Sequence, residues 1–206
     1  MAIKVIIFDF GGVIINLDRE ACVNRYKELG ISNADQLLDN YMQSGVFLDL
    51  EKGNISIDDF HEQIRLLSNN NLSDKDIDDA FHRFLLDIPL RRMNKILELR
   101  KRFRTVILSN TNQLHFPIES GKLVNSDFLI KDYFDYCYLS FRMHMSKPDE
   151  EIYNALLENE GVKAEECLYL DDGEKNISTA HRLGFNCYLV KNDNWIDEID
   201  GIINSI

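Results

Sequence analysis

The residues of this chain that could perform a reaction are polar side chains that each follow a short apolar run. In chain order they are Asp9, Ser109, Lys147 and the pair Asp171-Asp172. A carboxylate can attack a phosphoryl group, and water then cleaves the aspartyl-phosphate that forms. Such a transfer asks the protein mainly to position the reactants and to neutralise charge. A carboxylate, a hydroxyl and a lysine in one place therefore favour phosphoryl transfer, with Asp9, Lys147 and Ser109 as the catalytic candidates.

The same groups contain the oxygen ligands that a hard cation prefers. Mg²⁺ binds one or two carboxylates together with phosphate oxygens and water. We expect Asp9, Asp172, its neighbour Asp171 and the carbonyl oxygen of Gly11 to supply the protein ligands, so Mg²⁺ is the predicted cofactor. Lys147 would cancel negative charge on both the nucleophile and the phosphoryl group.

Flexible backbone and an amide side chain complete the predicted phosphate site. Gly11 and Gly12 directly follow the segment that ends in Asp9 and Phe10, and glycine lets the backbone approach a ligand closely. Ser109 and Asn110 belong to a hydroxyl and amide cluster suited to phosphate oxygens. Gly12, Ser109 and Asn110 are therefore the predicted substrate contacts in this part of the chain.

Five apolar runs predict the strands that position these residues. Helical patterns separate most of the runs, which favours a parallel sheet with right-handed crossovers. In an open α/β sheet, ligands bind at the carboxyl ends of the strands, where Asp9 and its partners would meet. The predicted fold class is a doubly wound α/β core with a mainly parallel five-stranded sheet, formed by Val5–Phe8, Thr105–Leu108, Tyr136–Leu139, Cys167–Leu170 and Cys187–Val190.

The interval between the first two predicted strands is too long for a single crossover helix. Its apolar periodicity predicts a small inserted helical bundle. We expect a core of residues 1–16 and 88–206, and a cap of residues 17–87 that packs over the carboxyl edge of the sheet. The four predicted cap helices are Glu20–Leu29, Ala34–Gln43, Ile57–Leu67 and Lys75–Leu86.

The charge composition of the chain limits the kinds of binding partner that we expect. The 206 residues carry 35 acidic and 23 basic side chains, a formal net charge of −12. That excess disfavours nucleic acid and membrane as partners, while one lysine and one cation can still create a site for a small phosphorylated metabolite. No signal-peptide pattern precedes the first strand and the four cysteines form no CxxC pair, which favours buried thiols and a cytoplasmic location. We expect a monomer or a homodimer.

Four motifs in chain order, FDFGGV, LSN, KPDEEIY and YLDDGEKN, resemble those of the haloacid dehalogenase superfamily, most of whose members are Mg²⁺-dependent phosphatases. The helical insertion looks like the cap of the family's first subclass. The segment from Phe47 to Ser56 is also similar to a cap segment in one branch of the family. That branch contains sugar-1-phosphate phosphatases and the phosphatase domain of soluble epoxide hydrolase.

The resemblance implies a role for each motif residue. Asp9 would be the nucleophile and a metal ligand, Ser109 would bind phosphate and Lys147 would stabilise charge. Asp172, with Asp171 beside it, would anchor the metal. The predicted function is therefore Mg²⁺-dependent hydrolysis of a small phosphomonoester through a phosphorylated Asp9.

The predicted cap would close over the site, exclude water and contact the organic part of the substrate. Phe47, Leu48 and Glu51 are the cap residues that we expect nearest to the substrate. Helical caps of similar pattern accept sugars, nucleotides and acids, so the sequence predicts a substrate class and not a single substrate.

Position 11 departs from the family pattern. Phosphatases of the family usually carry a second aspartate two residues after the nucleophile, which protonates the leaving oxygen and then activates water. Here that residue is Gly11, and the loss of such acid–base help typically costs ~10²–10⁴-fold in rate. Another group or water could replace the aspartate, the substrate could have a good leaving group, or the chemistry could differ.

Two alternatives to a phosphatase remain open. One is a catalytically weak member of the family that binds a ligand or a protein partner, and the other is a haloacid dehalogenase, which attacks carbon without a metal.

Three further residues could replace the missing acid or lie near it. Arg142 and His144 precede Lys147, and either could replace the acid, although an exposed loop is the favoured interpretation; His115 follows the second-strand motif and could approach the site.

Overall fold

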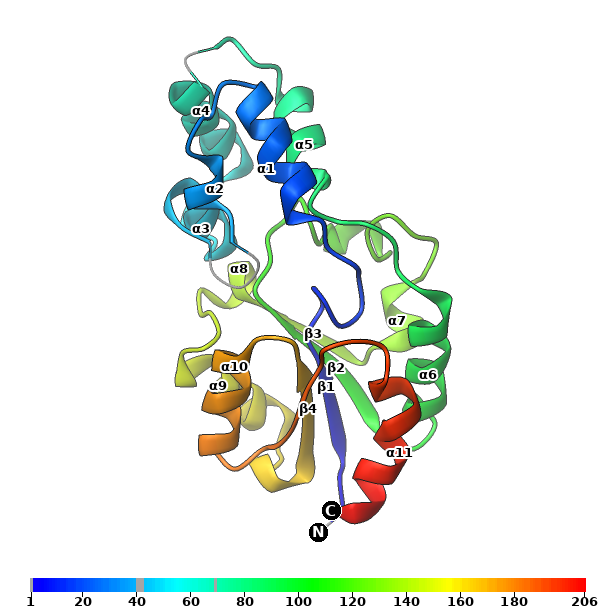
Figure 1. Cartoon of the computed structure of the whole chain (residues 1–206). Coiled ribbons are helices and arrows are strands. Elements are labelled where there is room, and N and C mark those ends of the chain that lie inside the picture. Colours follow the sequence, from blue (N-terminus) through cyan, green and yellow to red (C-terminus); the bar gives the residue numbers. More distant parts are fainter. Residues whose placement is uncertain (1, 40–42, 69) are drawn as a thin grey trace.

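A computed structural model of the chain describes residues 2–39, 43–68 and 70–206, and five strands run side by side through its centre (Figure 1). Every pairing between neighbouring strands is parallel, in the order β3-β2-β1-β4-β5. This arrangement confirms the predicted fold class. The strands are β1 Val5–Phe8, β2 Arg104–Ser109, β3 Tyr136–Leu139, β4 Cys167–Asp171 and β5 Asn186–Leu189.

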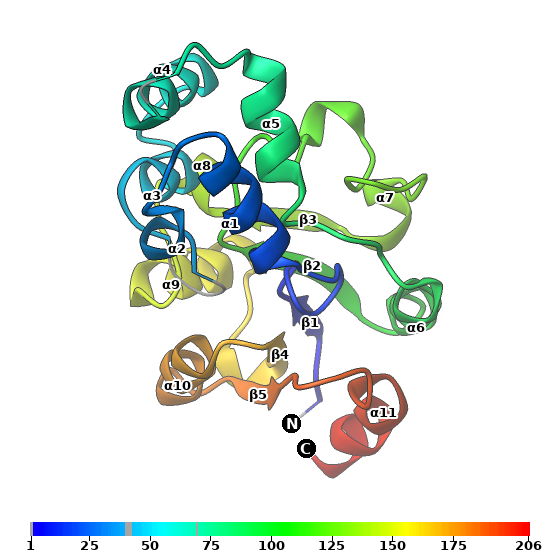
Figure 2. The ribbon, with the colours of Figure 1, turned by 45° about the horizontal axis from the view of Figure 1, so that its top comes forward.

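Helices cover both faces of the sheet, which is why its central strands carry continuous apolar runs rather than alternating apolar and polar residues. Successive side chains of a strand point to opposite faces. In β1, Ile6 and Phe8 pack in one hydrophobic cluster, while Val5 and Ile7 pack in the other. The helices on the first face are α6 (Leu90–Arg100) and α11 (Trp195–Ser205), and those on the second are α9 (Glu150–Glu160) and α10 (Glu174–Arg182) (Figure 2).

A group of helices lies beyond the carboxyl ends of the strands, between β1 and β2 in sequence (Figure 1). Two shorter helices, α7 (Ile130–Tyr133) and α8 (Ser140–Met143), flank β3. The described residues contain no helix long and apolar enough to cross a membrane. The cap helices are α1 Arg19–Glu28, α2 Ala34–Leu37, α3 Gly45–Glu51, α4 Ile57–Ser68 and α5 Asp74–His82.

The cap contains five described helices where four were predicted. The predicted helix Ala34–Gln43 ends at Leu37, and the part of it at 40–42 lies outside the described residues. It ends there because Leu38 is extended and fully buried, with its carbonyl accepting a hydrogen bond from Arg19 Nε at 2.7 Å. The additional helix is α3, which carries Glu51 at its last position.

The interior of the cap is a cluster of aromatic rings around Phe47. Its ring centroid lies 5.3 Å from that of Tyr26, 5.4 Å from that of Phe60 and 5.3 Å from that of Phe81. Offset and edge-on ring pairs at this spacing stabilise a core. Phe47 is fully buried there, so the expectation that it lies near the substrate is wrong. Its ring holds the cap helices together instead.

Candidate active site

Asp9 lies where the order of the strands reverses. After β1 the chain continues to β2 on one side, while β4 lies on the other side of β1, and ligands bind in such α/β sheets at this reversal. The N–H of Asp9 donates to the carbonyl of Leu170 at 2.9 Å, which fixes the end of β1 against β4. Asp9, Asp171 and Asp172 therefore lie at the same edge of the sheet.

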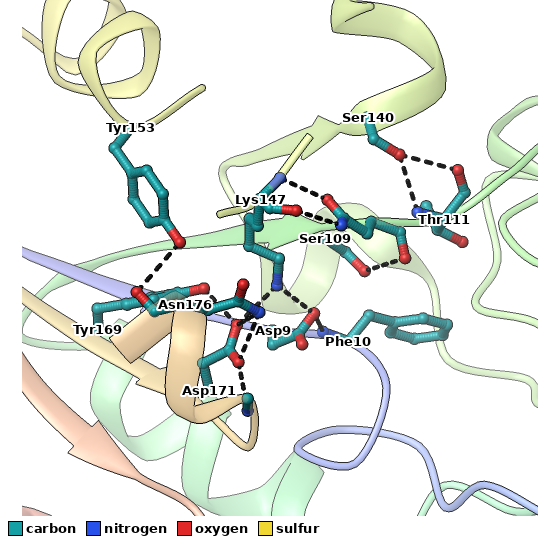
Figure 3. Close-up of polar contacts among 12 residues, drawn as sticks. Asp9, Phe10, Ser109, Thr111, Ser140, Lys147, Tyr153, Tyr169, Asp171 and Asn176 are labelled. Atoms are coloured by element: carbon teal, nitrogen blue, oxygen red, sulfur yellow. Dashed lines mark hydrogen bonds and ion pairs between the residues drawn. The ribbon is translucent and has the colours of Figure 1, made fainter. Parts of the chain in front are cut away.

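Lys147 lies between Asp9 and Asp171 (Figure 3). Its Nζ is 2.9 Å from Asp9 Oδ1 and 2.7 Å from Asp171 Oδ2, and its side chain is 1% exposed. Burial by itself would lower the pKa of Lys147, but the charges of Asp171 and Asp9 outweigh it and raise that pKa above its usual value. Lys147 is consequently a permanent positive charge next to Asp9.

Asp171 is fully buried, and both of its oxygens accept hydrogen bonds from the protein. Oδ1 accepts from the N–H of Gly173 at 2.7 Å and from Nδ2 of Asn176 at 3.0 Å. Oδ2 accepts from Lys147 and from the hydroxyl of Tyr169. Asp171 thus holds Lys147 in place, and Asn176 orders the loop after β4.

The carboxylates of Asp9, Asp171 and Asp172 each have an oxygen within 4.8 Å of the other two. Burial raises the pKa of Asp9, and Lys147 offsets this only in part. Burial and the charge of Asp171 also raise the pKa of Asp172, to about 6. Three carboxylates against one lysine leave an excess of negative charge that a hard divalent cation would balance. The donor set therefore fits Mg²⁺.

Two glycines border this cluster. A Cβ at Gly12 would lie 2.2 Å from Asp172 Oδ2, and the φ of Gly12 is +70°, so Asp172 can occupy its place only because position 12 is glycine. Among the described residues, none donates a hydrogen bond to the carbonyl oxygen of Gly11. That oxygen is free to bind a cation.

The residues after β2 have two different roles. Ser109 is 2% exposed and lines the same cavity as Asp9. The side chain of Asn110 instead holds the backbone of Lys147, because its Nδ2 donates to the Lys147 carbonyl at 2.9 Å and its Oδ1 accepts from the Lys147 N–H at 2.8 Å. These bonds use the oxygen and one N–H of the Asn110 amide, and Asn110 also lines the cavity.

A cavity of about 80 Å³ lies above Asp9. Its core-side lining includes Asp9, Ser109, Lys147 and Asp172, and a larger hollow of about 620 Å³ adjoins it, lined in part by Gly12 and Asp172. The small volume corresponds to roughly two or three water-sized groups. The cap contributes the opposite wall, which consists of Leu17, Gln43, Glu51, Phe81, Phe84 and Leu85.

Glu51 reaches this cavity from the end of α3 and is 6% exposed. Burial raises the pKa of its carboxyl from 4.5 to about 8, against the opposing effects of Lys147 and Lys52. Leu48, which was also expected near the substrate, is only half-buried and does not line the cavity.

Of the two histidines that the sequence analysis names, one lies inside the site and one outside it. His115 lines the cavity, and its Nε2 lies 3.1 Å from the carbonyl oxygen of Phe81. Burial lowers the pKa of His115 to about 3, so its ring is neutral and Nε2 donates to that carbonyl. His144 and Arg142 are exposed and do not line the cavity, so the suggestion that either replaces the missing acid is wrong.

Several cavity residues were not predicted from the sequence. Gln43, Phe81, Phe84 and Leu85 come from the cap and Thr111 from the loop after β2. The cap residues occupy ordinary positions of amphipathic or loop segments, which carry no local signal for a site. Thr111 is part of the hydroxyl and amide cluster that does carry such a signal.

The sequence of this chain is similar to those of known hydrolases. A family model described as haloacid dehalogenase-like hydrolase matches residues 3–184. A D-ribitol-5-phosphate phosphatase from Bacteroides thetaiotaomicron is 36% identical over 98% of this chain and 100% of its own length. The mouse (Mus musculus) bifunctional epoxide hydrolase 2 is 25% identical over 93% of this chain, which spans 37% of the mouse protein.

The fold is also similar to that of a solved crystal structure. It is that of a haloacid dehalogenase-family enzyme from Bacteroides thetaiotaomicron in complex with magnesium and inorganic phosphate. The two chains are 37% identical and superpose with a TM-score of 0.84, over 93% of this chain and 96% of that one. Both the sequence and the fold are thus similar to those of a protein that binds magnesium and phosphate.

Proposed function

Because this chain belongs to the haloacid dehalogenase-like hydrolase family, we propose that it is a Mg²⁺-dependent phosphatase that hydrolyses a small phosphomonoester through a phosphorylated Asp9. One observation carries the proposal. The carboxylate of Asp9 faces a small cavity, pairs with the buried Lys147 and belongs to a cluster of three carboxylates. A nucleophile, a fixed positive charge and a cation site within one cavity are what phosphoryl transfer requires.

In this proposal Asp9, Asp172 and the carbonyl of Gly11 hold the cation. Asp9 Oδ1 accepts from a backbone N–H at 2.6 Å and pairs with Lys147, but no described residue donates a hydrogen bond to Asp9 Oδ2. Both oxygens of Asp171, in contrast, already accept hydrogen bonds. Asp171 therefore adds negative charge to the cluster without binding the cation, and it orients Lys147. When bound, Mg²⁺ would supply positive charge beside the phosphoryl oxygens.

The remaining residues position the phosphoryl group. Asp9 attacks phosphorus and becomes the acyl phosphate, and water then releases inorganic phosphate and restores Asp9. Lys147 stabilises the charge on both Asp9 and the transferring group, while Ser109 and the neighbouring N–H groups bind non-bridging oxygens. The cap wall excludes bulk water, which strengthens each of these interactions.

We propose a phosphorylated polyol or sugar as the substrate class. The support is the similarity over the full length to a D-ribitol-5-phosphate phosphatase. The polar groups of the upper cavity, Gln43, Glu51, Thr111 and His115, could bind hydroxyl groups of such a molecule. A small phosphorylated metabolite is also the partner that the sequence predicted.

A second candidate function is a weakly catalytic member that binds a ligand. The observation that favours it is Gly11, which provides no acid–base group beside Asp9. A haloacid dehalogenase is disfavoured, because displacement of halide from carbon needs no metal ion and therefore no cluster of carboxylates suited to a cation.

A panel of phosphorylated sugars, polyols, nucleotides and acids, assayed for phosphate release with and without Mg²⁺, separates these functions. We expect Mg²⁺-dependent release from at least one phosphorylated sugar or polyol, and none from Asp9→Asn. A silent panel, combined with thermal stabilisation of the protein by one of the same compounds, would support the ligand-binding alternative.

A further inference from the structure

We propose that Glu51 of the cap is the general acid and base of the hydrolysis, in place of the carboxyl group that position 11 lacks. This inference rests on the phosphatase function proposed above. It assigns to the cap a direct part in the chemistry, in addition to covering the site.

The position of the Glu51 carboxyl supports this role. It lines the cavity above Asp9 together with Lys147 and Ser109, yet only 6% of the residue is exposed. No described residue forms a hydrogen bond or ion pair with its carboxyl group within bonding distance. Among the described cap residues that line the cavity, Glu51 alone can exchange a proton. A buried carboxyl without a partner has its polar atoms available to a bound substrate.

Core contacts hold Glu51 in place on the side of the cavity opposite the sheet. The hydroxyl of Ser140 donates to the carbonyl of Glu51 at 2.7 Å and accepts from the N–H of Thr111 at 2.9 Å. Two residues later Gly53, with a φ of +68°, packs so closely on α8 that a Cβ there would lie 2.2 Å from the carbonyl oxygen of Phe141. The end of α3 is therefore tied directly to the loops that follow β2 and β3.

Burial also sets the protonation state of Glu51. It raises the pKa to about 8, although Lys147 and Lys52 lower it in part. The other titratable groups that line the same cavity are Asp9, Asp172 and His115. The free protein would thus hold Glu51 as a neutral acid at neutral pH. A pKa close to the working pH suits a group that first gives up a proton and later takes one back.

The other cavity residues are less suited to protonate a leaving oxygen. The pKa of His115 is lowered to about 3 by burial, and its ring proton is donated to the carbonyl of Phe81. Lys147 is engaged by two carboxylates. Gly11 has no side chain; a side chain added there would fit after a small shift of Leu17, whose Cδ1 would lie 3.2 Å from the new Cβ.

The proposed steps balance as follows. Asp9 forms a bond to phosphorus as the bond from phosphorus to the ester oxygen breaks, and the departing oxygen takes the proton of Glu51 to leave as an alcohol. Glu51, now a carboxylate, accepts a proton from the water that attacks phosphorus. The bond to Asp9 breaks, phosphate leaves, and both carboxyl groups return to their starting states.

The test compares two substrates that differ in leaving group. The leaving group of D-ribitol 5-phosphate is an alkoxide that must be protonated to leave as the alcohol. The leaving group of p-nitrophenyl phosphate is a phenolate that is stable without a proton. We expect Glu51→Gln to lower kcat/KM for ribitol phosphate by ~10²–10⁴-fold, and that for the nitrophenyl ester by far less, because only the first needs the acid. Glu62→Gln, on the exposed surface of α4 in the same cap, is the matched control and should match the wild type on both substrates.

Two further readouts separate catalysis from packing. The kcat/KM of the wild type for ribitol phosphate should fall above a pH near 8, because Glu51 then loses its proton, and this decline should be absent in Glu51→Gln. The double variant Gly11→Asp/Glu51→Gln should regain part of the lost rate on ribitol phosphate, since it restores a carboxyl group near the leaving oxygen.

Equal losses on both substrates in Glu51→Gln, or no loss on either, would overturn this assignment while leaving the phosphatase function intact. A wild-type protein that releases phosphate from neither substrate nor from any other phosphomonoester would overturn the phosphatase function, and this inference with it.

Discussion

Lys147 Nζ lies 2.9 Å from Asp9 Oδ1, and this ion pair is largely buried at the centre of the site. Two segments far apart in sequence thus meet at one atom pair, and Asp171 holds the same ammonium group from the other side. Removal of Lys147 would leave two carboxylates without their counter-charge.

We expect Lys147→Met to lose activity and stability together. A fixed positive charge at the transferring group is typically worth ~10²–10³-fold in rate, and the orphaned carboxylates should lower the free energy of unfolding by about 3–5 kcal/mol. Steady-state kinetics and urea denaturation measure the two effects. A variant as stable and as active as the wild type would show that this ion pair has no role.

The two neighbouring aspartates should respond differently to amide substitution. Asp172→Asn removes a proposed ligand and should abolish Mg²⁺ binding, whereas Asp171→Asn acts through its neighbours and should weaken binding by roughly 10–100-fold. Calorimetric titration of each folded variant with Mg²⁺ gives the comparison. Complete loss of Mg²⁺ binding in both variants would show that Asp171 is also a metal ligand.

The burial of Glu51 makes the free energy of unfolding dependent on pH. Burial raises its pKa from 4.5 to about 8, so across that interval the folded protein keeps a proton that the unfolded chain has lost. Stability should consequently fall as the pH rises through the interval, by up to about 1.4 kcal/mol per pH unit.

Glu51→Gln should remove this dependence. Its stability relative to the wild type should increase by roughly 2–4 kcal/mol between about pH 5 and about pH 8, whereas Glu62→Gln should show no such trend. Urea denaturation at each pH is the measurement. A constant difference between Glu51→Gln and the wild type would mean that Glu51 titrates in the folded protein as it does in water.

Gly12 and Gly121 provide a matched pair of substitutions. Both have a positive φ, so alanine should cost roughly 1 kcal/mol of backbone strain at either position. Only at Gly12 would the new Cβ meet Asp172, while at Gly121 nothing lies within 4 Å of it. Gly12→Ala should therefore lose Mg²⁺ affinity and turnover, and Gly121→Ala should keep both. Equal behaviour of the two variants would remove the steric argument for Gly12.

The strands and the residues at their ends were predictable because the signal is local. Val5–Phe8 is an apolar β-branched run that could only be a buried strand, and its boundaries are as predicted. Asp9 follows it directly, so the position of the strand also gives the position of the carboxylate.

The roles of the cap residues were less predictable, because tertiary packing decides which of them fill the cap core and which line the cavity. Phe47 and Glu51 lie one turn apart on the same face of α3, so no periodicity distinguishes the ring that fills the cap core from the carboxyl that lines the cavity. The hydrogen bonds of Asn110 and Asp171 to Lys147 were not predictable for a similar reason, since Lys147 lies far from both in sequence, in the loop between α8 and α9.

The central claim is that Asp9 carries the phosphoryl group during turnover. The direct measurement is mass spectrometry of the protein quenched in acid during turnover of a phosphomonoester with Mg²⁺. We expect a phosphoryl group on the peptide that contains Asp9, and none without Mg²⁺ or in Asp9→Asn. Phosphate release at the wild-type rate by Asp9→Asn, or a phosphoryl group on another residue alone, would contradict the account.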